Sequence, residues 1–172
     1  MTPPLTIAQL NSLSREEFVR IVGPIFEHSP WIAEAAWSNR PFVNREALRI
    51  ALIRQVLDAG EAKQVSLIQA HPDLVGRAAL AGGLTPESNR EQASAGLDRL
   101  TAAEIQAFQR SNEAYRQKFG FPFVICARLN KKDAILRGFE ARLKNDRPRE
   151  IETALIEIEK IARLRLEDLV KD

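Results

Sequence analysis

His71 is a candidate for proton transfer near neutral pH. It begins a segment, residues 71–96, that also contains a Gly-Gly pair and a Ser-x-x-Glu-Gln pattern and that reads HPDLVGRAALAGGLTPESNREQASAG. Histidine is the side chain whose unperturbed pKa lies nearest to pH 7. Pro72 disfavours the α conformation in the residue before it, so His71 is predicted to stand at the end of a helix. A helix C-terminus favours an imidazolium by about 0.3–1 kcal/mol, so a histidine that only caps the helix fits the same spacing.

Ser88, Glu91 and Gln92 form a second group of polar side chains. They occupy positions i, i+3 and i+4 of a helix predicted over residues 86–97, so they share one face and could meet one polar ligand. The alternative is that Glu91 faces water and Ser88 takes part in capping, which is the more common fate of such residues. Spacing alone leaves both interpretations open.

A third candidate group lies in the last predicted helix, which contains Arg163 and Arg165. Their side chains differ by about 200° around the helix axis at 3.6 residues per turn, so only one of them can face a pocket. A guanidinium suits a carboxylate or ureido group because it donates two parallel hydrogen bonds. Most helix arginines are solvated or form weak surface pairs, and spacing does not choose between these two.

The composition argues against metal, nucleotide, nucleic-acid and membrane sites. The sequence has two histidines, one cysteine and no close group of His, Cys, Asp and Glu, so no metal site is expected. Neither a Walker-type lysine motif nor a G-x-G-x-x-G turn after a strand is present. The 25 Lys and Arg residues are interspersed with 23 Asp and Glu residues, so no nucleic-acid partner is expected. No apolar run approaches the roughly 20 residues of a membrane span, so no membrane partner is expected either.

A single cytoplasmic domain over residues 1–172 is the expected organisation. One hydrophobic core commonly serves roughly 100–200 residues. Cys126 is the only cysteine, which excludes an intrachain disulfide and fits a reducing compartment. The first residues, MTPPLTIAQL, lack the basic and apolar regions of a signal peptide.

Helices must position these residues, and capping residues predict where most of them begin. The predicted helical segments are a short turn after Thr6, Ser14 to about Phe26, a short helix after Pro30, Asn44 to Ala59, about Glu61 to His71, about 86–97, Thr101 to Gly120, and Pro148 to about Val170. Only Phe119–Cys126, with the sequence FGFPFVIC, is different, because it is apolar and interrupted by Pro122. It is predicted to be an extended connector. Since no second strand-like run can pair with it, the expected fold is an all-α, single-domain bundle of about seven to nine helices.

Three motifs, taken together, resemble one enzyme family. They are HPDLVGRAALAGGLTPESNREQASAGL, the YRQKFGFPFVICA block and the ending EIEKIARLRLEDLV. With the PF-x-N-R-E-A-L segment that begins at Pro41, they resemble the decarboxylases of 2-oxo-4-hydroxy-4-carboxy-5-ureidoimidazoline (OHCU). That family catalyses the last step in the conversion of urate to (S)-allantoin.

The resemblance implies an all-helical, cofactor-free enzyme that acts on the small molecule OHCU and forms a homodimer. It implies that His71 and Glu91 are the catalytic pair. It also implies a set of substrate-binding residues: Pro72, Ser88, Gln92 and Arg165, together with the connector residues Phe119, Gly120, Phe121, Pro122, Phe123, Val124 and Ile125. Within this set, Arg165 is preferred to Arg163 only through the alignment of the last helix.

The division of roles between the catalytic residues stays open at this stage. His71 is the better candidate for proton transfer near neutral pH, with Glu91 orienting or polarising, but the sequence does not exclude the reverse. Two other functions compete with decarboxylation of OHCU. One is a non-catalytic module that binds a ureide such as allantoin, and the other is a lyase or hydrolase that acts on a related ureide.

Overall fold

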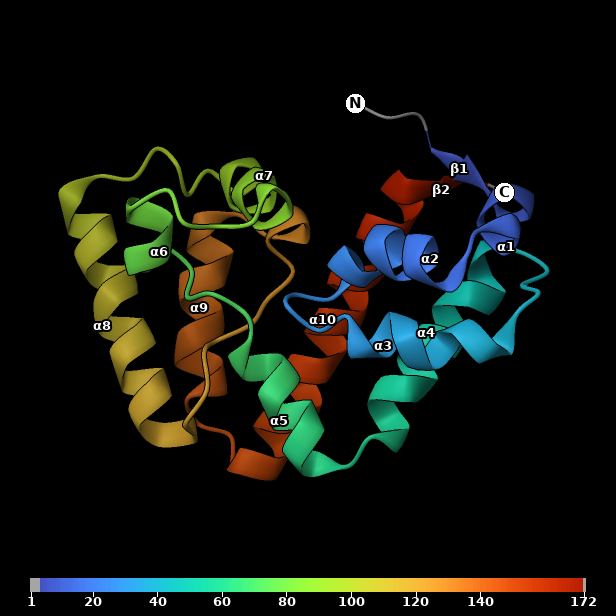
Figure 1. The fold of residues 1–172 in the computed structure, drawn as a ribbon. Coiled ribbons are helices and arrows are strands. Elements are labelled where there is room, and N and C mark those ends of the chain that lie inside the picture. Colours follow the sequence, from blue (N-terminus) through green and yellow to red (C-terminus); the bar gives the residue numbers. More distant parts are fainter. Residues whose placement is uncertain (1–3, 172) are drawn as a thin grey trace. The chain divides into compact units, whose positions relative to one another are not determined.

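A computed structural model describes residues 4–171, apart from the side chains of residues 77 and 78. These residues are mostly helical, and their single strand pair joins β1 (Leu5–Thr6) to β2 (Val170–Lys171) in parallel (Figure 1). The all-α fold class predicted from the sequence is confirmed. Among the helices in this part of the chain, none is both long and apolar enough to cross a membrane.

The chain divides into two compact units. The first unit comprises the chain up to Ala70 together with the segment from Glu159 onward, and the second comprises His71–Ile158. The single domain expected over residues 1–172 stays a prediction, because this division describes compactness and not independent folding.

The first unit is built from helices whose starts follow from local capping. Its elements besides the two strands are α1 (Ile7–Ser12), α2 (Arg15–Val22), the 3-10 turn η1 (Gly23–Ile25), α3 (Trp31–Ala36), the 3-10 turn η2 (Trp37–Asn39), α4 (Arg45–Asp58), α5 (Glu61–Gln69) and the later part of α10 (Arg147–Leu169). Thr6 and Ser14 each form a capping box, and the side chain of Asn44 accepts a hydrogen bond from the N–H of Ala47. Phe18 is fully buried against the rings of Trp37 and Phe42.

The second unit contains most of the predicted site. Its elements are α6 (Arg77–Leu80), α7 (Pro86–Ser94), α8 (Ala102–Phe119), the 3-10 turn η3 (Ala127–Leu129), α9 (Lys132–Arg142) and the first part of α10. α8 begins with a capping box between Thr101 and Glu104 and ends at Gly120, which has the left-handed φ of 79° that glycine adopts without strain. α8 and α9 lie side by side (Figure 1).

Several element boundaries differ from the prediction. The helix expected to reach Phe26 ends at Val22 and tightens into the turn η1, and the helix expected to reach residue 97 ends at Ser94. Two helices, α6 and α9, have no counterpart among the predicted segments. α9 lacks the usual signal because Lys131 at its N-cap position makes no side-chain capping bond, and Gly138 in its middle lowers helix propensity.

Candidate active site

The loop after α5, residues 71–76 (HPDLVG), carries His71 and is named the His71 loop. α5 ends at Gln69, so His71 lies outside the helix, as Pro72 predicts. Its side chain is buried, with 7% of the residue exposed, and Pro72 is half-buried. The N–H of Gly76 donates to the carbonyl of Asp73 at 3.3 Å and closes a turn. A Cβ at Gly76 would stand 2.7 Å from the Cβ of Asp73, so this tight turn requires glycine.

α8 binds the His71 loop through two residues one helical turn apart. Arg116 Nε donates to both carboxylate oxygens of Asp73, at 2.8 and 2.9 Å. Asn112 Nδ2 donates to the carbonyl of Leu74 at 2.7 Å, and this contact is buried. The backbone and a side chain of the loop are therefore both attached to one face of α8.

α7 presents the predicted polar face to the interior. Thr85 caps the helix by accepting from the N–H of Ser88 at 3.3 Å. Ser88 and Gln92 are 6% and 7% exposed, and Glu91 between them is half-buried. The face shared by these three residues is thus largely withdrawn from water, and its role in binding stays a prediction.

Gln92 connects α7 to the His71 loop. Its Oε1 accepts a hydrogen bond from the N–H of Val75 at 3.2 Å, in a buried contact. Within the described residues its Nε2 donates to no protein acceptor, so this donor is the part of the side chain left for a ligand. The Oε1 of Gln92 therefore supports the His71 loop, and its Nε2 is available to a ligand.

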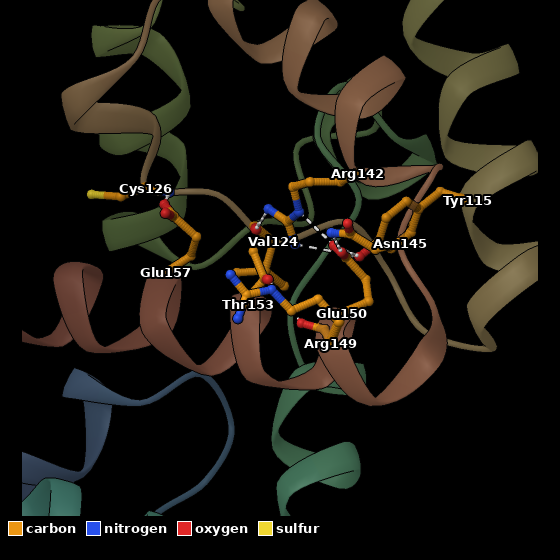
Figure 2. A network of polar contacts seen from close by, with 9 residues as sticks. All are labelled: Tyr115, Val124, Cys126, Arg142, Asn145, Arg149, Glu150, Thr153 and Glu157. Carbon is orange, nitrogen blue, oxygen red and sulfur yellow. Dashed lines mark hydrogen bonds and ion pairs between the residues drawn. The ribbon is translucent and has the colours of Figure 1, made fainter.

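The predicted connector is non-helical from Phe121 to Cys126, and Phe119 is the last residue of α8. Residues 121–124 are buried and Ile125 is half-buried. The carbonyl of Val124 accepts from Arg142 Nη1 at 2.7 Å, and the N–H of Cys126 donates to Glu157 Oε2 at 2.8 Å (Figure 2). α9 and α10 therefore fix the far end of the connector.

Other backbone groups of the connector lack such partners. In the part of the chain that the structure describes, the N–H groups of Phe123, Val124 and Ile125 donate to no protein acceptor. Phe123 and Val124 are nevertheless 1% and 4% exposed. Buried backbone donors nearly always have a partner. These N–H groups are consequently the ones that a bound ligand or water would satisfy.

A buried polar network is bonded to the connector through Arg142 (Figure 2). Glu150 is 0% exposed and accepts from Arg142 Nε, from the hydroxyl of Tyr115 and from Asn145 Nδ2. Arg142 Nη2 also donates to the Tyr115 hydroxyl at 3.3 Å. Burial, more than any neighbouring charge, raises the pKa of Tyr115, so its hydroxyl keeps the proton that it donates to Glu150.

The negative charge of Glu91 acts on the thiol of Cys126, at the end of the connector. Burial is the largest cause that raises the pKa of the Cys126 thiol, and the negative charges of Glu157 and Glu91 raise it further. α7 contacts η3 directly, and Lys131 Nζ donates to the carbonyl of Ser94 at the end of α7. The second unit therefore brings together the His71 loop, the polar face of α7 and the end of the connector.

Arg165 and Arg163 are distinguished by burial within the first unit. Arg165 is 7% exposed, and its Nη1 donates to Glu27 Oε2 at 3.1 Å and to the carbonyl of Pro24 at 3.2 Å. The side chain of Arg163 is 49% exposed and pairs with Glu167 at 3.8 Å, one turn along the helix. Only Arg165 has the held geometry that a guanidinium needs to present fixed donors.

Sequence reasoning missed the residues that hold the site. Asn112 lies on the buried face of α8 with Phe108, Tyr115 and Phe119, at the 4-3-4 spacing of an apolar stripe. A polar residue in such a stripe is a signal that was available in the sequence. No three His, Cys, Asp or Glu side chains gather as metal ligands among the described residues.

Comparison with known proteins places the chain in a family. The sequence profile of OHCU decarboxylase matches residues 11–167. The chain belongs to the OHCU decarboxylase family. The His71 loop, α7, the connector and Arg165 all lie inside the region that matches this family.

Members of the OHCU decarboxylase family match nearly the whole chain. The 2-oxo-4-hydroxy-4-carboxy-5-ureidoimidazoline decarboxylase of Halalkalicoccus jeotgali is 44% identical, over 96% of this chain and 92% of that protein. The enzyme of the same name from Haloferax volcanii is 46% identical, over 94% of each chain. A crystal structure of (S)-allantoin synthase is similar with a TM-score of 0.77 and 28% identity, over 98% of this chain and 54% of that one. This chain therefore spans about half the length of that crystallised protein.

Proposed function

We propose that this chain decarboxylates OHCU to (S)-allantoin and carbon dioxide, without a cofactor, and that His71 and Glu91 are its catalytic pair. The observation that carries the proposal is the match to OHCU decarboxylases of nearly equal length, at 44% and 46% identity. The geometry supports it further, because His71 is buried in a loop that is bonded to the helix of Glu91 and Gln92.

The chemistry of OHCU explains why the reaction needs acid–base residues and no metal. The bond between C4 of the ring and its carboxylate breaks, and carbon dioxide leaves. The electron pair forms a C4=C5 bond while the C=N bond at C5 opens and its nitrogen takes up a proton. The hydroxyl on C4 then loses its proton to become a carbonyl, and C5 receives a proton on one face. One proton is consumed overall, and the enzyme determines which face of C5 receives it.

The proposed roles follow from the chemistry of each residue and from the family resemblance, which alone assigns Arg165 of the first unit to the same substrate. His71 transfers protons to and from the ring near neutral pH, and Glu91 orients or polarises the hydroxyl group. Arg165, Ser88 and the Nε2 group of Gln92 bind the ureido and carbonyl groups, with Pro72 beside the histidine. The free backbone donors of the connector bind ring oxygens, and its phenylalanine rings limit access of water to the planar intermediate.

Circular dichroism of the product tests the reaction. OHCU is generated in situ from urate, and its spontaneous decay gives racemic allantoin as the control. The purified protein should produce the (S)-allantoin signal faster than this background. His71→Ala should lower turnover about 10²–10⁴-fold while the protein stays folded. A folded protein that binds allantoin but gives no signal above the background would instead be the ureide-binding module.

The choice between the two arginines has its own test in the same assay. Arg165→Lys should reduce kcat/KM, since an ammonium group cannot reproduce a planar, forked contact. Arg163→Lys is the matched control and should leave kcat/KM unchanged, because Arg163 is exposed. A loss in the Arg163 variant alone would reverse the assignment.

We further propose that the protein is a cytoplasmic homodimer. Val43, Ile50 and Leu57 are 85%, 47% and 60% exposed and recur every seven residues along and before α4, which supplies an apolar surface for a second copy. Light scattering should then give twice the chain mass of 19.3 kDa. A mass of one chain at micromolar concentration would contradict the dimer.

A further inference from the structure

Asn112 and Arg116 on α8 both bond the His71 loop, and the proposed mechanism gives neither of them a role. Arg116 is an exposed partner of Asp73, with 44% of its side chain accessible. Asn112 is different, because it is 6% exposed and its Nδ2 reaches the carbonyl of Leu74 at 2.7 Å. The buried contact is the one that can determine the conformation of the loop backbone.

The amide of Asn112 is present at a cost to stability. Its Oδ1 is buried and accepts no hydrogen bond, among the residues that the structure describes. A buried polar atom without a partner lowers stability, whereas an apolar residue of similar size at this position would avoid that cost. The neighbours of Asn112 along the buried stripe of α8 are Phe108, Tyr115 and Phe119. Packing alone therefore does not explain the asparagine, whereas its bond to Leu74 does.

The loop has a strained residue next to this bond. Val75 has a φ of 54°, which is unfavourable for a β-branched residue. Such conformations persist where the surroundings fix the backbone on both sides. Here the carbonyl of Leu74 is bonded to Asn112, and the N–H of Val75 is bonded to Gln92.

The strained turn lies three and four residues after His71 in the same short loop, so its conformation limits where the imidazole can stand. We propose that Asn112 is a positioning residue for His71, acting through the carbonyl of Leu74. The inference rests on the proposed function in one respect, namely that His71 performs the proton transfer. Asn112 itself contacts the loop backbone and takes no part in the chemical step.

Nuclear magnetic resonance of the two imidazoles tests this positioning without any turnover. The chain has only His71 and His28, and the side chain of His28 is 70% exposed in the other unit. Asn112→Leu should shift the His71 signals, while the His28 signals stay in place. Asn112→Asp is the second variant, because it keeps the shape but places an acceptor against the carbonyl of Leu74. Gln109→Leu, on the exposed face of α8, is the matched control.

Kinetics with OHCU gives the second readout on the same variants. Both Asn112 variants should lower kcat about 10²-fold and change KM much less, because the histidine is misplaced whereas Ser88, Arg165 and the connector do not depend on this bond. His71 signals and kcat equal to those of the Gln109→Leu control, in either folded Asn112 variant, would overturn the proposal. If His71→Ala kept full turnover, the catalytic role of His71 would fail, and the resonance measurement would still decide whether Asn112 positions the loop.

Discussion

The His71 loop and the FGFPFVI connector, both in the second unit, are held in place by different kinds of contact. The loop is bonded to polar side chains of α7 and α8, because Gln92, Asn112 and Arg116 each contact a different residue of the loop. The connector packs phenylalanine rings against Tyr115 and Phe139, and Arg142 bonds to its backbone. Arg142 is in turn paired with the fully buried Glu150.

The two segments therefore differ in how much free energy is needed to displace them. A neutral hydrogen bond contributes a net of about 0.5–1.5 kcal/mol, and an exposed ion pair such as that of Arg116 with Asp73 contributes about 0–1 kcal/mol, so the His71 loop can be displaced without unfolding the unit. Removal of one partner from a buried ion pair costs about 3–5 kcal/mol, so the connector cannot be released in the same way. The proposed acid–base residue His71 therefore lies in the segment that can be displaced, and the proposed binding backbone lies in the segment that cannot.

Arg142→Leu, which removes a contact of the connector, should have the largest effect on the free energy of unfolding. It leaves Glu150 buried without its cation and removes the donor to the carbonyl of Val124, so the free energy of unfolding should fall by about 3–5 kcal/mol. Urea denaturation measures it. Arg149→Leu is the control, since the side chain of Arg149 is 63% exposed. A stable Arg142→Leu variant would mean that the aromatic rings and the bond of Cys126 to Glu157 are enough to hold the connector.

Gly76→Ala should affect the His71 loop, and it should lower kcat more than it lowers stability. The new Cβ would stand 2.7 Å from the Cβ of Asp73, so the turn must shift and move His71 with it. We expect kcat to fall about 10²-fold, while the free energy of unfolding falls by only about 1–3 kcal/mol. Steady-state kinetics and urea denaturation on one preparation separate the two effects. Gly23→Ala is the control, because its Cβ would meet nothing closer than 3.5 Å.

Glu104→Gln should have the smallest effect, because it changes a surface contact that holds neither region. Hydrogen bonds from Lys132 and Thr101 lower the pKa of Glu104 from 4.5 to about 2. A lowered folded-state pKa stabilises the protein above the unfolded pKa, and this contribution is lost as the pH falls from about 4.5 towards 2. Urea midpoints at about pH 6 and pH 3 should therefore differ less in the variant than in the unaltered chain. Equal differences would show that this contact contributes nothing to stability.

The sequence predicted the parts of this fold that depend on local contacts. The capping boxes at Thr6, Ser14 and Thr101 are found as expected, and Pro72 places His71 outside its helix. The common face of Ser88, Glu91 and Gln92 also follows from helical spacing alone, because residues three and four apart lie on the same side of a helix.

The supports of the site could not be predicted in the same way. Asn112 and Leu74 are 38 residues apart, and Tyr115 and Glu150 are 35 apart, so neither contact leaves a periodic pattern. The strand pair of β1 and β2 is two residues long, too short for an alternation to be read. The catalytic roles of His71 and Glu91 stay predictions, which turnover measurements on the His71→Ala variant address.

The thiol of Cys126, whose N–H is bonded to Glu157, can report when this end of the connector opens. Cys126 is the only cysteine and is 1% exposed, and its raised pKa keeps the thiolate fraction low at neutral pH. A thiol reagent will therefore modify the native chain only during moments when this end of the connector opens. The labelling rate of one natural side chain then measures the local opening equilibrium beside the site, without an introduced probe.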